Sequence, residues 1–243
     1  MLDDDFMSRV FDKNIKCTEF ILRIILDKPD IKVKEVHTQK EIKNLLGHSV
    51  RLDIYAINAD NEPIDIEVQR SDKGAGVKRA RYNSSMIDAN SLIRREEYDK
   101  LPESYVIFIT ENDVIGGNLQ VYHADRIVSE TGRPFGDGSH IIYVNAAYCD
   151  ESPIGKLMHD FSCKNPSDMY YELLAEQVRY YKEDEEGVEA MCRIVEELID
   201  GEKKEIALEL LKLNKLSFDE VAKCSRLPFE EVEKIAEGIE ELQ

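Results

Sequence analysis

Two carboxylates on neighbouring stretches of the chain have the spacing of a cation site. Residues 50–57 and 63–69 both alternate apolar and polar side chains, the pattern of half-buried β-strands, and the five residues between them favour a turn. In a hairpin centred on Asp60, Asp53 faces Glu67 at a Cβ separation of roughly 5 Å. Like charges that face each other destabilise a sheet, and a divalent cation removes that penalty. The pair therefore predicts a metal site.

Hydrolysis of a phosphodiester is the chemistry that such a site would perform. Mg²⁺ prefers oxygen ligands and keeps several waters, so the carboxylates of Asp53 and Glu67 and the backbone carbonyl of Val68 would suffice to hold it, with Mn²⁺ as a substitute. Gln69 lies on the same strand face as Glu67 and can orient a water or a phosphate, although its neutral amide adds no charge. The apolar residues of the two strands then face the core on the opposite side: Leu52, Ile54, Ile64, Ile66 and Val68.

A basic segment follows the two acids directly. Residues 70–95 carry seven basic and two acidic side chains, although the net charge of the whole chain is −18. A helix predicted over about 77–97 includes Arg79 and Arg81, which can neutralise a phosphate, and Tyr82, which can donate a hydrogen bond to it. Not all of these side chains can face one phosphate, and Arg81 and Tyr82 are the preferred pair. The alternative is a solvated helix face, with the acids paired to arginines.

Composition and charge exclude several classes of protein. The chain is 42% hydrophobic and 34% charged, which is typical of a globular fold. No apolar run approaches the roughly 20 residues that span a bilayer, and the acidic N-terminus does not resemble a signal peptide, so we expect no membrane partner. Five scattered cysteines without C-x-x-C spacing, and five histidines without ligand spacing, argue against a structural zinc site and for free thiols in a reducing cytoplasm.

The order of elements predicts an α/β fold, a mixed sheet flanked by helices with an all-helical C-terminal appendage. We expect one domain at 1–150 and an acidic helical appendage at 151–243. The predicted elements before residue 150 are a helix at 3–27 and strands at 31–38, 50–57, 63–69, 105–109, 119–128 and 140–147, with the helix at 77–97 between them. The predicted helices of the appendage cover 153–161, 167–183, 186–200, 202–214, 218–224 and 229–242.

The appendage carries a pattern reminiscent of a helix-turn-helix at 206–232. Its last predicted helix, 229–242, holds six acids and one lysine, which would repel DNA phosphates. We therefore expect the appendage to contact a protein partner, or a second copy of the chain, rather than to read DNA.

Several segments together resemble one nuclease family. Asp53, a hairpin and Glu67-Val68-Gln69 resemble the acid and E-x-K signature of the PD-(D/E)XK nuclease superfamily, with glutamine in place of lysine. With Val50-Arg51-Leu52-Asp53, Lys78-Arg79-Ala80-Arg81-Tyr82 and the 101–109 segment, residues 3–148 resemble the PD-(D/E)XK nuclease family transposases, the recombination-promoting nucleases of the Rpn type.

The resemblance implies a restriction-endonuclease-like core and Mg²⁺-dependent DNA endonuclease activity linked to recombination or mobile DNA. It makes Asp53 and Glu67 the metal ligands and adds an acid from the first helix, for which Glu19, Asp5 and Asp12 are the candidates. Two alternatives remain open. The chain could be a catalytically inactive nucleic-acid- or protein-binding module that retains the fold, which the glutamine and the acidic surface favour, or it could cleave RNA.

Overall fold

The computed structural model describes residues 4–44, 47–70, 74–93, 95–213 and 215–240, which form two compact units, Met1–Arg179 and Tyr180–Gln243. Helices α4 (Pro153–Ser162) and most of α5 (Glu172–Glu183) belong to the first unit. The domain boundary expected at residue 150 stays a prediction. Among the described residues, no helix is both long and apolar enough to cross a membrane.

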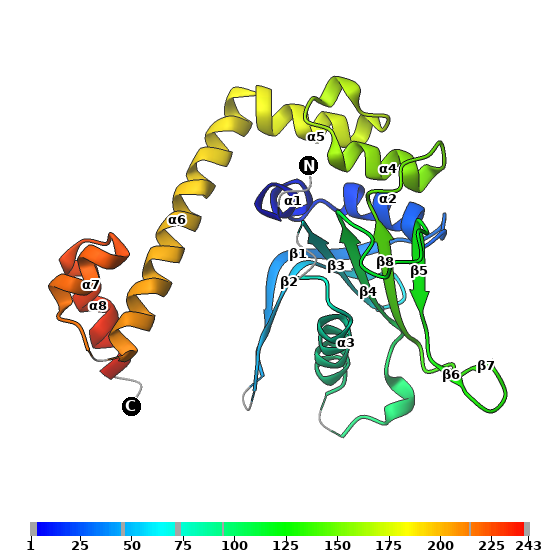
Figure 1. Ribbon diagram of the computed structural model, residues 1–243, viewed down its shortest axis with the longest axis horizontal. Helices are drawn as coiled ribbons and strands as arrows, with labels where there is room; N and C mark the ends of the chain where they lie inside the picture. Colours follow the sequence, from blue (N-terminus) through cyan, green and yellow to red (C-terminus); the bar gives the residue numbers. More distant parts are fainter. Residues whose placement is uncertain (1–3, 45–46, 71–73, 94, 214, 241–243) are drawn as a thin grey trace. The chain divides into compact units, whose positions relative to one another are not determined.

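A six-stranded mixed sheet forms the centre of the first unit, in the order β1-β2-β3-β4-β8-β5 (Figure 1). Strands β1, β2 and β3 are antiparallel neighbours, β3, β4 and β8 run parallel, and β5 is antiparallel to β8. The strands are β1 (Val33–Ile42), β2 (Val50–Asn58), β3 (Pro63–Gln69), β4 (Ser104–Thr110), β5 (Val121–Ala124) and β8 (Ser139–Asn145), with a small ribbon of β6 (Ile127–Val128) and β7 (Arg133–Pro134). The predicted mixed sheet is confirmed.

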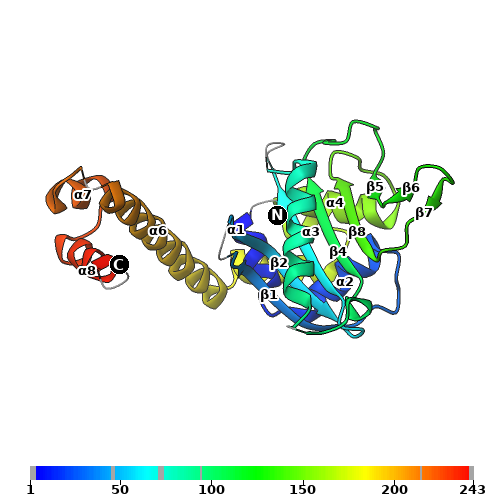
Figure 2. The same ribbon diagram turned by 90° about the horizontal axis from the view of Figure 1, so that it is seen from below.

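Helices cover both faces of this sheet. Helices α1 (Asp4–Phe11) and α2 (Ile15–Ile25) lie on one face and α3 (Val77–Ser91) lies across the other (Figures 1 and 2). The single helix predicted over 3–27 was wrong, because Lys13 adopts a left-handed backbone with φ 53° and Asn14 begins a new helix by accepting the Cys17 N–H. Two short 3₁₀ turns, Tyr98–Lys100 and Pro166–Asp168, complete the unit.

The hairpin at 50–69 has the predicted register. Strands β2 and β3 pair Ile54 with Ile66, as in a hairpin centred on Asp60, and one further step in this register brings Asp53 opposite Glu67. The five apolar side chains expected on the opposite face are all at most 1% exposed. Strand β2 keeps the expected alternation at Arg51 and Asp53, whereas β3 is more buried than expected, because α3 also covers its acids.

In the described part of the second unit the regular elements are all helices. It contains α6 (Glu185–Leu213), α7 (Phe218–Ser225) and α8 (Phe229–Glu240), so the break expected at Gly201 is absent and one helix replaces two. Ala207, Val221, Leu227 and Val232 form its buried apolar cluster. The all-helical C-terminal appendage is therefore confirmed.

Candidate active site

A row of acids lies on the sheet face beneath α3. Asp65 and Glu67 share this face of β3 because alternate residues of a strand point the same way, and Asp53 approaches them from β2. Asp65 and Glu67 are both 0% exposed, whereas Asp53 is half-buried. Asp65 was not singled out from the sequence, although its place two residues before Glu67 puts it on the same strand face.

Asp53 and Glu67 meet at the amide of Gln69. The Gln69 Nε2 lies 3.5 Å from Asp53 Oδ2 and 3.4 Å from Glu67 Oε2. The Val68 N–H donates to the same Asp53 oxygen at 3.2 Å, which fixes that carboxylate at the end of the β2–β3 ladder. The structure therefore brings together the acid pair and the glutamine that the sequence singled out.

Helix α3 supplies two partners to the acids. Arg79 forms an ion pair with Glu67 through Nη2, and its Nη1 donates to the Gly74 carbonyl at 2.9 Å. Asn83, one turn further along, donates through Nδ2 to Asp65 Oδ2 at 3.1 Å and to Glu67 Oε1 at 3.3 Å. Sequence reasoning missed Asn83, although its position four residues after Arg79 places both side chains on one helix face.

The burial of these acids changes their protonation. Removal from water and then the charge of Asp53, opposed by Arg79, together raise the pKa of Glu67 to about 7. Burial and the neighbouring Glu67 raise the pKa of Asp65 well above its usual range, against the hydrogen bond from Asn83. The buried acids therefore favour their neutral forms, because the surrounding protein groups do not fully stabilise three neighbouring negative charges.

These residues fit a divalent cation that prefers oxygen ligands. The guanidinium of Arg79 already occupies a cation's place on Glu67, and Asp65 Oδ1 is buried without a hydrogen-bond partner among the described residues. Asp53, Gln69, Arg79 and Asn83 line an open hollow of about 410 Å³, through which an ion and a substrate can enter. Glu67 does not line this hollow, but Arg79, which pairs with it, does.

The other predicted substrate-binding residues lie in different places. Tyr82 lines the same hollow, where its hydroxyl donates to the His48 carbonyl at 2.5 Å. Arg81 is exposed and lines a separate hollow with Arg126. Of the two arginines it is thus Arg79 that contacts the acids, and a phosphate-binding role for Arg81 stays a prediction.

The candidate first-helix acids have structural partners. Glu19 pairs with Arg23 and Lys32 and accepts the Val33 N–H, at the start of β1. Asp12 accepts a hydrogen bond from the Thr38 hydroxyl at 3.1 Å. The side chain of Asp5 lies outside the described residues. A ligand role for any of the three stays a prediction.

The fold and site together define an α/β protein whose mixed sheet carries a buried, arginine-paired carboxylate cluster. The family model described as PD-(D/E)XK nuclease family transposase matches residues 12–153, more than half of the chain. The chain therefore belongs to the PD-(D/E)XK nuclease family transposases, as its sequence segments predicted. No curated protein and no solved structure matches it.

Proposed function

We propose that this protein is a metal-dependent endonuclease that hydrolyses DNA phosphodiester bonds in recombination or in the movement of mobile DNA. The family supports nuclease chemistry in general. The observation that carries the proposal is the meeting of Asp53 and Glu67 at one amide nitrogen, in a site where three acids lie close together and one arginine pairs with Glu67. The cytoplasmic location expected from the free cysteines belongs to the same proposal.

Asp53 and Glu67 would hold Mg²⁺ or Mn²⁺, with the Val68 carbonyl as a further ligand. The bound ion would polarise the phosphate and lower the pKa of a water that attacks it. Gln69 reaches both carboxylates, so its amide is placed to orient that water by hydrogen bonding. Because this amide is neutral, the positive charge has to come from elsewhere in the site.

Arg79 is the residue that supplies this charge. Its side chain is 38% exposed and lines the hollow, so one guanidinium can reach both Glu67 and a phosphate in the hollow. In the metal-free protein it acts as the counter-ion of Glu67. Arg51 also lines the hollow and adds positive charge beside the acids. Much of the protein's negative charge lies in the C-terminal appendage, away from these residues in the sequence.

A plasmid-nicking assay tests the proposal. Purified protein with Mg²⁺ or Mn²⁺ should nick supercoiled DNA, and the isosteric Asp53→Asn and Glu67→Gln variants and the Asp53→Ala, Glu67→Ala double variant should not. Glu130→Gln, at an exposed position, is the matched control and should cleave like the wild type. Equal rates for wild type and double variant would refute the enzymatic role. Matched RNA and DNA substrates distinguish the RNA alternative.

A catalytically inactive binding module is the second candidate. It is favoured by Gln69 in the place of a lysine and by the ion pair of Arg79 with Glu67, in which the arginine takes the position of a metal ion. Calorimetry separates the two functions. An enzyme should show a Mg²⁺ or Mn²⁺ binding heat that disappears in Glu67→Ala, whereas a module should bind DNA without any such heat. A partner protein or self-association through the appendage stays a prediction, which the molar mass in solution with and without residues 180–243 would check.

A further inference from the structure

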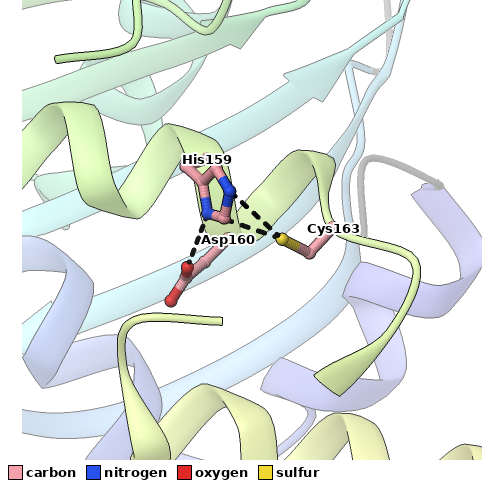
Figure 3. A group of neighbouring side chains, drawn as sticks. All are labelled: His159, Asp160 and Cys163. Atoms are coloured by element: carbon pink, nitrogen blue, oxygen red, sulfur yellow. Dashed lines mark hydrogen bonds and ion pairs between the residues drawn. The ribbon is translucent and has the colours of Figure 1, made fainter. Parts of the chain in front are cut away.

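A second cluster of metal-ligating side chains lies at the end of α4, apart from the acid row. His159 and Cys163 are one helical turn apart, and the Asp160 carboxylate contacts the His159 ring, so potential ligand atoms of all three lie close together (Figure 3). The His159 Nδ1 lies 3.3 Å from Asp160 Oδ1 and 3.5 Å from Cys163 Sγ. One potential ligand atom from each residue lies within 4.8 Å of the other two.

The two separations from His159 Nδ1 match edges of a tetrahedral zinc site, and the Asp160 and Cys163 ligand atoms lie within 4.8 Å of each other. With Zn–S of about 2.3 Å and Zn–N and Zn–O of about 2.0–2.1 Å, ligands at tetrahedral angles are about 3.6 Å apart for sulfur and nitrogen and about 3.3 Å for nitrogen and oxygen. The observed distances from His159 Nδ1 are 3.5 Å to sulfur and 3.3 Å to oxygen. Both edges share the same imidazole nitrogen, as a single ion would require.

Neighbouring groups already hold the ligands in position. Asp160 is 0% exposed, and its two oxygens accept the backbone N–H groups of Tyr170 at 2.7 Å and Tyr171 at 2.8 Å. Each carboxylate oxygen has two lone pairs, so Oδ1 retains acceptor capacity for an ion. The His159 ring packs edge-on against Tyr170, with 4.7 Å between ring centroids. Such support of the ligands is typical of built metal sites.

We propose that His159, Asp160 and Cys163 bind a zinc-class transition-metal ion. A thiolate and an imidazole select Zn²⁺ over the hard Mg²⁺ of the acid site. The three side chains leave a fourth coordination position for water, and binding releases the thiol proton to solvent. The ion would connect the last turn of α4 to the segment at 170–171 through Asp160. The expectation of no structural zinc site rested on the lack of cysteine pairs and histidine pairs, and the H-D-x-x-C spacing at 159–163 contains neither.

Cobalt titration tests this site without reference to cleavage. Co²⁺ added to the reduced full-length protein should produce a thiolate-to-cobalt absorption band in the near ultraviolet that saturates at one equivalent and that Zn²⁺ abolishes. The band should disappear in Cys163→Ser, and His159→Gln should weaken binding at least about tenfold, while Cys224→Ser, at an exposed cysteine of the second unit, should behave as wild type. The Asp53→Asn, Glu67→Gln double variant should keep the band.

Zn²⁺ should also raise the melting temperature of the wild type and of Cys224→Ser but not of Cys163→Ser. Circular dichroism of each variant establishes that it is folded, and a misfolded Cys163→Ser is replaced by Cys163→Ala. The proposal is overturned if the wild type gives no thiolate band, if the band survives in both Cys163 variants, or if it requires Asp53 and Glu67 instead.

Discussion

Replacing Glu67 with glutamine should stabilise the metal-free protein while it abolishes metal binding. Glutamine has nearly the shape of the acid, and its one amide oxygen can still accept from one of the two amide donors, Asn83 or Gln69. It removes a negative charge that is 0% exposed and lies close to Asp53 and Asp65. The variant therefore separates the role of Glu67 in metal binding from its effect on the free energy of unfolding.

The size of the effect follows from the pKa of Glu67, which is 4.5 in the unfolded chain and about 7 in the fold. Between these values the folded protein binds a proton that the unfolded chain has released, so the free energy of unfolding falls as pH rises through this window. A difference of about 2.5 pKa units corresponds to about 3 kcal/mol. At pH 8 the Glu67→Gln variant should be more stable than the wild type by up to this amount, and near pH 4 the two should be equal.

Urea unfolding followed by circular dichroism, between pH 4 and 8 with a chelator present, measures this difference. The wild-type curve should decline with pH more steeply than that of Glu67→Gln, whose remaining slope reflects Asp65, since its pKa is also raised. Mg²⁺ at pH 8 should stabilise the wild type and leave the variant unchanged. Glu130→Gln, at an exposed site, should follow the wild-type curve throughout.

Parallel curves of unfolding free energy against pH for the wild type and Glu67→Gln would refute the reasoning, because they would show that the charge of Glu67 does not destabilise the folded protein. A variant that is less stable than the wild type at pH 8 would show instead that the ion pair with Arg79 outweighs burial.

Three further substitutions test individual contacts. In Gly74→Ala the new Cβ would lie 1.9 Å from Gln69 Oε1, so the amide must turn away. DNA cleavage should fall by about 100-fold while the melting temperature is unchanged. Full cleavage activity in this variant would show that Gln69 has no role in catalysis. In Gly155→Ala the Cβ would lie 2.4 Å from the Asp150 carbonyl oxygen, which should cost about 1–3 kcal/mol in urea unfolding; an unaffected midpoint would contradict this packing. Ser217→Ala removes the capping box of α7 and should cost about 1 kcal/mol, seen as faster amide exchange confined to that helix rather than spread over the chain.

Local pattern was sufficient to predict the hairpin and its register. Alternation with a period of two and a turn around Asp60 place Asp53 opposite Glu67, because a slip of one residue would move every apolar side chain out of the core. The continuous apolar run at 105–109 likewise predicted a central strand, and all of β4 is buried. These features depend on neighbours in the sequence, so the sequence alone contains them.

Helix boundaries were predicted less well, because local signals for continuing or ending a helix conflicted and contacts within the fold decided between them. The run at 3–27 looked like one helix, but the left-handed Lys13 and the cap at Asn14 divide it. Gly201 looked like a break, yet α6 continues through it and buries Ala207 against the other helices of its unit. A glycine within a helix costs only about 1 kcal/mol, which tertiary packing readily outweighs.

The sequence by itself determined the strands, the acid pair, the glutamine and the family of this protein. Only the tertiary structure decided that α3 lies over the acids, that Arg79 rather than Arg81 contacts Glu67, and that Asp65 is buried beside it. The physical reason is that the direction in which α3 crosses the sheet selects which of its side chains point inward. That direction depends on contacts between residues far apart in the chain, such as Ala80 and Phe108 in the shared core, and no local period encodes it.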